Sequence, residues 1–136
     1  MLNECIEFHD SDILQVTVTD SNSMVIRMKA YIHRSTGAPG IDPGSGWVQN
    51  VELNIKELYS YGGLPITITC ILSGLLIIAD RAYLNQIPIP LSTNSHIFYS
   101  VILDNGSSFS VDGKGAILTL LGEARYVEEF SGSNAK

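Results

Sequence analysis

The sequence carries little charge, and its basic residues are few. Only 16% of its 136 residues are charged, the eight Lys and Arg residues are scattered along the chain, and the formal net charge is −6. Proteins that bind nucleic acid or anionic membrane surfaces gather basic side chains into patches. The sequence therefore predicts neither a nucleic-acid partner nor a membrane partner.

Cysteine is also scarce. Cys5 and Cys70 are too few for a disulfide framework, and Cys70 lies in the apolar stretch ITITCIL, where a free thiol packs as a small hydrophobe. The longest apolar stretch is too short and too polar to span a bilayer, and the opening MLNECIEFHD lacks the basic and apolar regions of a signal peptide. We expect reduced thiols and a soluble cytoplasmic protein.

What the sequence does contain is alternation of apolar and polar residues with a period of two, which is typical of half-buried strands. One such face consists of Met24, Ile26, Met28, Ala30 and Ile32, and another begins at Leu14 with Val16 and Val18. The pattern predicts an all-β fold, a single-domain antiparallel β-sandwich or closed β-barrel of about eight strands with little or no helix. We expect one domain over residues 1–130 and a disordered tail at 131–136.

Glycines divide these strands at predictable places. Ser73-Gly74, Asp104–Gly106 and Asp112–Gly115 indicate turns, and Gly122 indicates a bulge or bend within the last strand. Residues 56–63 predict one helical turn or an irregular crossing.

The stretch HRSTGAPGIDPGSGW, from His33 to Trp47, is unusually long for a connection between two strands. It lacks the lysine and the following helix of a phosphate-binding loop, and Asp42 alone is a weak calcium ligand. Arg34 and Trp47, which stand near its two ends, are residue types enriched in binding hot spots. Two interpretations stay open: an ordered connection that covers the core, with Trp47 as a plug, or a surface for a partner.

Other residues with chemical potential have an ordinary structural alternative. His9 and Asp10, in FHDSD, resemble a base with its orienting carboxylate beside Ser11, but the same residues are typical of a turn. Glu123 and Arg125 fit an acid and an electrostatic clamp, or a solvated strand face. The three histidines lack the spacing of a ligand cluster, so no metal and no cofactor is predicted. No catalytic constellation is evident, which favours a non-enzymatic protein and leaves an enzyme open.

A pocket is the alternative basis for function. Tyr31 and His33 share the less apolar face of their strand with Arg27, and a barrel could present all three to a small molecule. The apolar stretch around Ser73-Gly74 offers a further possibility, because two apolar faces indicate either the most buried part of the fold or a homodimer interface.

Three segments taken in order, FHDSDILQVTV, AYIHRSTGAPGIDPGSGWVQNVELNI and LLGEARYVEEF, resemble a group of small uncharacterised bacterial all-β proteins over nearly the whole chain. The opening FHDS followed by a strand is similar to the openings of immunity proteins of bacterial toxin systems. The resemblance implies a compact bacterial β-domain in the cytosol and transfers no catalytic residue. We therefore expect a binding module that acts on another protein, of an immunity type or regulatory.

Overall fold

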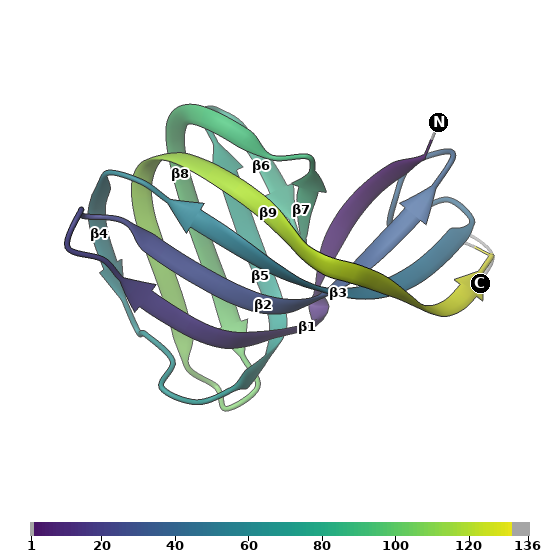
Figure 1. Ribbon diagram of the computed structural model, residues 1–136, viewed down its shortest axis with the longest axis horizontal. Coiled ribbons are helices and arrows are strands. Elements are labelled where there is room, and N and C mark those ends of the chain that lie inside the picture. Colours follow the sequence, from purple (N-terminus) through teal and green to yellow (C-terminus); the bar gives the residue numbers. More distant parts are fainter. Residues whose placement is uncertain (1, 132–136) are drawn as a thin grey trace.

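A computed structural model describes residues 2–131, without the side chain of Phe130, and it contains strands but no helix in that range. Consequently, no helix among these residues could cross a membrane. The tail predicted at 131–136 falls, from residue 132 onward, outside the described residues. Nine strands make up the fold (Figure 1): β1 (Asn3–Val18), β2 (Met24–Ser35), β3 (Gly44–Ile55), β4 (Leu58–Gly62), β5 (Thr69–Ile78), β6 (Arg81–Leu84), β7 (Gln86–Ile89), β8 (Ser92–Leu103) and β9 (Ser108–Phe130).

The strands form one antiparallel sheet that curls into a partial ring. Its hydrogen-bonded order is β6-β5-β8-β9-β3-β2-β1-β7, and β4 pairs with β9. Its two sides meet only briefly, where Asp12 and Ile13 of β1 pair with Cys70 and Thr69 of β5. The predicted all-β, single-domain fold is confirmed, as a barrel joined over only two residue pairs at this seam.

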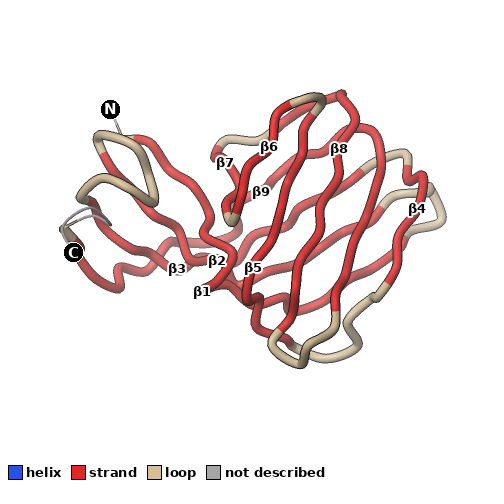
Figure 2. The backbone as a smooth tube through the Cα atoms, turned by 180° about the vertical axis from the view of Figure 1, so that it is seen from behind, coloured by secondary structure: helices blue, strands red, loops and turns tan. Residues whose placement is uncertain are grey.

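Four strands are longer than the barrel wall and continue beyond it. The outer parts of β1, β2, β3 and β9 run together into a twisted ribbon, with the ends of the described chain and the β2–β3 loop near its tip (Figure 1). The short strand β7 pairs with Glu4–Glu7 along the β1 edge of this ribbon. Figure 2 shows from behind that the strands pass from barrel to ribbon without an intervening loop. We call this ribbon, residues 3–7, 31–35, 44–48 and 125–130, the projecting sheet.

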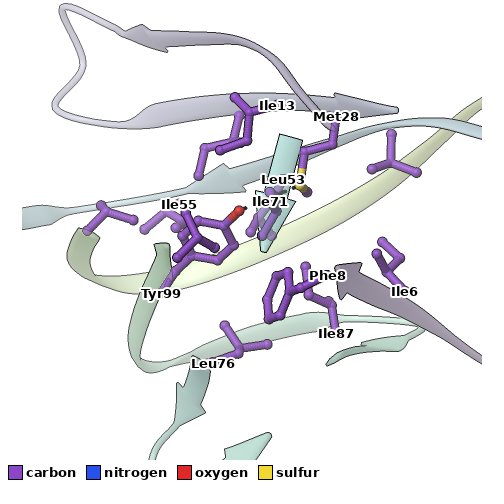
Figure 3. Close-up of a cluster of buried hydrophobic side chains, with 14 of the residues drawn as sticks. Ile6, Phe8, Ile13, Met28, Leu53, Ile55, Ile71, Leu76, Ile87 and Tyr99 are labelled. Carbon is purple, nitrogen blue, oxygen red and sulfur yellow. Dashed lines mark hydrogen bonds between the residues drawn. The ribbon is translucent and has the colours of Figure 1, made fainter. Parts of the chain in front are cut away.

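Apolar side chains fill the inside of the barrel. The predicted face of β2 is confirmed, since Met24, Ile26, Met28, Ala30 and Ile32 are all fully buried. Aromatic rings pack edge to face among them: the centroid of Phe8 lies 5.7 Å from that of Tyr99 (Figure 3). The centroid of Tyr99 lies 5.9 Å from that of Phe109. The interior is thus a packed core rather than a lumen for a ligand.

A large bulge in β1 marks the boundary between barrel and projecting sheet. Glu7 pairs with Tyr31 and Asp12 pairs with Lys29, so five steps along β1 match only two along β2. Within the bulge, Phe8 enters the core while His9 and Asp10 face solvent. The buried Ser11 hydroxyl donates to the Glu7 carbonyl (2.7 Å) and accepts from the Tyr31 N–H (3.0 Å). The predicted turn in FHDSD is therefore a bulge inside one strand.

A second, smaller shift follows at Leu14. Ile13 pairs with Met28 and Gln15 pairs with Arg27, which makes Leu14 an extra residue on β1. Val16 packs against the core as predicted, but Ile13, rather than Leu14, supplies the preceding core position.

Two predicted turns are wrong because their glycines serve close packing inside strands. β5 runs through Ser73-Gly74, where a methyl group on Gly74 would lie 2.7 Å from a ring carbon of Phe8. β9 runs through Asp112–Gly115, where a methyl group on Gly113 would lie 2.8 Å from the Lys56 carbonyl.

Elsewhere the glycine pattern is informative. Gly106 closes the predicted turn with φ of 87°, donating its N–H to the Leu103 carbonyl at 2.9 Å. The predicted bulge at Gly122, with φ of 65°, is confirmed by a register shift between β3 and β9. Residues 56–63, predicted as a helical turn or irregular crossing, instead contain β4, which continues the line of β3 along β9.

Candidate functional site

The long glycine-rich stretch is shorter as a loop than the sequence suggests. Arg34 pairs with Ser45 and Ile32 with Trp47, so both predicted end residues lie on strands of the projecting sheet. The connecting loop proper is residues 36–43.

On one face of the projecting sheet, four side chains from four strands form a continuous row, which we call the aromatic row: Glu4, Arg34, Trp47 and Tyr126. The Arg34 guanidinium lies 4.3 Å above the Trp47 ring centroid, and its Nε lies 2.6 Å from Oε2 of Glu4. The Trp47 and Tyr126 rings meet edge to face at 5.4 Å. The Trp47 indole N–H donates to the Ser45 hydroxyl at 2.8 Å. Sequence reasoning identified Arg34 and Trp47 but missed their two partners.

The partially exposed row combines a cation with two aromatic rings. Arg34 and Trp47 are partly buried, while Tyr126 is 52% exposed. A guanidinium over an indole is a favourable cation–π contact, and the carboxylate of Glu4 fixes its position. The arrangement presents a preorganised aromatic surface.

On the opposite face, Tyr31 ties β2 to β9. Its hydroxyl donates to Oε2 of Glu128 at 2.7 Å, and the phenol lies over Gly46, where a methyl group would be 2.0 Å from the hydroxyl oxygen. Burial, followed by the hydrogen bond to Glu128 and then the charge of Glu128, raises the pKa of Tyr31 well above its usual range. Tyr31 is thus a neutral donor that holds two strands together.

His33 anchors the loop to this same face. The imidazole is buried, its Nδ1 accepts the N–H of Gly40, and Oε1 of Glu7 lies 3.7 Å from that nitrogen. Burial lowers the pKa of His33, against the opposing effect of Glu7. An Nδ1 that accepts an N–H belongs to a neutral ring, so His33 holds the loop as an acceptor.

Asp42 stabilises the loop from within. Its carboxylate accepts the Ala38 N–H at 2.6 Å, and its own N–H donates to the Ala38 carbonyl at 2.8 Å. This is turn chemistry rather than a cation site. The loop is therefore an ordered segment folded back onto His33.

The remaining predicted residues lie in three other places. The exposed side chains of His9 and Asp10 lie side by side on the bulge of β1, 3.1 Å between Nε2 and Oδ2. Glu123 and Arg125 line a groove of about 250 Å³ beside the Gly122 bulge. Arg27 pairs with Glu52. The Tyr31 hydroxyl donates to Glu128. Arg27 and Tyr31 thus have different carboxylate partners.

The three histidines have different carboxylate neighbours: Asp10 for His9, Glu7 for His33 and Asp112 for His96. His9 and His33 nevertheless both approach Glu7, since ligand atoms of Glu7, His9 and Asp10 all lie within 4.8 Å of one another. Sequence reasoning missed Glu7, although its alternation with Cys5 and His9 along an expected strand was a usable signal.

Cys5 lies beside this group. Its thiol is buried, and burial together with the charge of Glu7 raises its pKa to about 12. Cys5, Glu7 and His9 line a cavity of about 240 Å³, with Gly40 and Ile41 from the loop among its other walls.

The chain matches no family model, no curated protein and no solved structure. Its function must accordingly be argued from its own residues, and the resemblance to bacterial proteins stays a prediction.

Proposed function

We propose that the protein is a non-enzymatic binding module that contacts another protein through the aromatic row of the projecting sheet. The observation that carries this proposal is the line of Glu4, Arg34, Trp47 and Tyr126 across four strands beyond the barrel. Trp, Tyr and Arg dominate the binding energy of protein interfaces, particularly where neighbouring side chains already hold them in place.

The surroundings of the row favour a partner with basic side chains. Glu129 on β9 is exposed and acts electrostatically on Tyr126, and the whole chain has a net charge of −6. Apolar anchors with a charged rim are typical of specific interfaces. Charge complementarity of this kind mainly accelerates association and excludes wrong partners.

The finer features follow the sequence resemblance. A bacterial origin, a cytoplasmic location and an immunity-type or regulatory role belong to the proposal, and an immunity-type role makes a toxin the partner to test. The alternative of a small-molecule pocket at Arg27, Tyr31 and His33 gains no support from the contacts that Arg27 and Tyr31 make with Glu52 and Glu128.

The test compares capture by the wild type with capture by an Arg34→Ala/Tyr126→Ala variant. Tyr59→Ala is the matched control, since Tyr59 is similarly exposed but lies on β4 of the barrel. Proteins from the native host that bind the wild type and the control, but not the double variant, are then purified and titrated by calorimetry.

We expect the double variant to bind such a partner at least about tenfold more weakly, since two hot-spot truncations commonly cost more than 1.4 kcal/mol. Added salt should weaken association through its rate. A partner bound equally by the wild type and the double variant, or no specific partner at all, would overturn the proposal.

A further inference from the structure

The last part of β1 has a strand partner on one side only. Gln15–Val18 pair with β2. On the other side of β1, β7 pairs with Glu4–Glu7 and β5 pairs with Asp12 and Ile13, and no further strand of the described chain follows them. Gln15–Val18 therefore form a free edge of the sheet. This edge carries neither charge nor proline, which usually protect exposed edges from pairing.

The backbone groups of Val16 and Val18 point outward from this edge. At the turn between β1 and β2, the Thr19 N–H donates to the Ser23 carbonyl at 2.8 Å, so the backbone of Thr19 faces β2. Backbone groups alternate in direction along a strand, which turns those of Val18 and Val16 away from β2. Neither outward N–H and neither outward carbonyl makes a hydrogen bond within residues 2–131.

An uncharged groove of about 320 Å³ lies beside the free edge. Residues 13–16 of β1 form one wall and residues 64–67 form the other. The second wall belongs to the loop between β4 and β5, residues 63–68, which passes below β1 in Figure 1. On this loop, Ile66 is 96% exposed and Ile68 is 68% exposed. Large apolar side chains that gather on a surface are typical of an interaction site.

We propose that this groove holds an extended peptide segment of a partner protein, which pairs with Val16 and Val18 as an added strand of the sheet. In this mode of recognition, main-chain hydrogen bonds supply affinity and alternate side chains of the peptide enter the groove. The uncharged walls select apolar residues at those alternate positions. Because the loop already flanks the edge, a single extended segment fits there better than the broad edge of a second barrel.

The outward backbone groups favour a peptide over a lipid surface. Hydrocarbon offers no hydrogen bonds, and open sheet edges do not occur within it. A peptide strand offers donors and acceptors at alternate residues, which is the spacing between Val16 and Val18.

Charge at one end of the groove indicates a further feature of the peptide. Burial, and after it the charges of Asp12 and Asp104, raises the pKa of the Cys70 thiol, so both carboxylates lie near this thiol. Cys70 pairs with Asp12 at the seam, just before the free edge. Neither aspartate forms an ion pair with a basic side chain of the described residues. We therefore expect a basic residue at the end of the peptide that lies beside the seam.

This inference goes beyond the proposed function, because the groove lies on the barrel and the aromatic row lies on the projecting sheet. Failure of peptide binding would leave the proposed function untouched.

The experiment selects peptides from a displayed random library on the full-length protein, and the enriched peptides are then titrated by calorimetry. Val18→Pro removes an outward N–H without removing a bond to β2, and Ile66→Asp places a charge in the wall of the groove. Leu84→Asp is the matched control, since Leu84 is 69% exposed on β6, outside the groove. Circular dichroism verifies that each variant is folded.

We expect the enriched peptides to share alternate apolar residues and a Lys or Arg at one end. They should bind the wild type and Leu84→Asp equally, and Val18→Pro and Ile66→Asp at least about tenfold more weakly. Amide hydrogen exchange at Val16 and Val18 should slow in the bound wild type. Replacement of the basic residue of the peptide by alanine should weaken binding to the wild type but not to Asp104→Asn.

Absence of any enriched peptide, equal binding by the wild type and Ile66→Asp, or unchanged hydrogen exchange at Val16 and Val18 would overturn the site. An equal loss in the wild type and Asp104→Asn would overturn the place given to the basic residue. Two other occupants are tested alongside. Binding of phosphatidylcholine vesicles without any enriched peptide would assign the loop to a lipid surface, and a dimer that Val18→Pro dissociates would assign the edge to a second copy. Either result would refute the proposal.

Discussion

Replacement of Ser11 by alanine tests the account of the bulge that joins barrel and projecting sheet. The Ser11 side chain is fully buried, and its hydroxyl makes two hydrogen bonds to backbone groups, with the Glu7 carbonyl at 2.7 Å and the Tyr31 N–H at 3.0 Å. Alanine deletes the oxygen and leaves both groups in place.

The expected loss of stability follows from those two bonds. A net hydrogen bond contributes about 1 kcal/mol, and a buried donor left without an acceptor costs about 1–3 kcal/mol. The space left by one oxygen atom is too small for a water molecule to restore the bonds. We expect the free energy of unfolding to fall by about 2–3 kcal/mol, or the melting temperature by roughly 6–10 °C for a chain of this size.

The assay is urea unfolding followed by circular dichroism, with Ser60→Ala as the control. Ser60 is exposed on β4, and exposed substitutions usually change stability by less than about 0.5 kcal/mol. A Ser11→Ala protein as stable as Ser60→Ala would show that the hydroxyl does not hold the bulge.

Three further outcomes are expected. Gly74→Ala places a methyl group 2.7 Å from Phe8 and should lower the free energy of unfolding of the wild type by about 1–2 kcal/mol. In a Phe8→Leu protein the same substitution should instead raise the free energy of unfolding. If urea unfolding shows destabilisation in both proteins, the packing argument is contradicted. Burial raises the pKa of the Tyr99 phenol above 10.0, so the contribution of Tyr99 to stability is complete below pH 10 and declines as the pH rises further. Above pH 10, the free energy of unfolding of Tyr99→Phe should therefore fall less steeply than that of the wild type, with a difference in slope of up to about 1.4 kcal/mol per pH unit. Equal slopes for the two proteins would refute this. Leu72 and Ile102 are about half exposed on the outer face of β5 and β8. Light scattering at micromolar concentration should show a homodimer through this face, and Leu72→Asp should dissociate it. A monomeric wild type would exclude this interface.

Much of the fold could be predicted from alternation because most strands bury one face. The apolar face of β2 illustrates this, since a period of two that repeats over a whole strand does not fit the 3.6-residue period of a helix. The turn at Gly106 was equally predictable because Asn-Gly favours positive φ. Such local rules fix what each strand buries.

Glycines were misinterpreted where their cause is not local. Gly74 admits the Phe8 ring from a distant strand, and Gly113 admits the backbone at Lys56. A sequence shows the missing side chain but does not show the neighbour that requires its absence. The same limit hid the aromatic row, since Glu4 and Tyr126 join Arg34 and Trp47 only through strand register.

The length of four strands is the strongest argument that the projecting sheet serves binding. Of the described side chains in the projecting sheet, only Ile6 and Ile32 belong to the buried core cluster, with Trp47 packed against it. The other residues add little to the core, yet each costs about 1–2 kcal/mol of conformational entropy to order. The sheet recovers part of this through its own contacts, with Tyr31 bonded to Glu128 on one face and Arg34 stacked on Trp47 on the other. The stability of the barrel alone does not require a cation held between a carboxylate and an indole beside an exposed tyrosine. Such order is useful in a binding surface, because side chains that are already ordered lose little further conformational entropy when a partner binds.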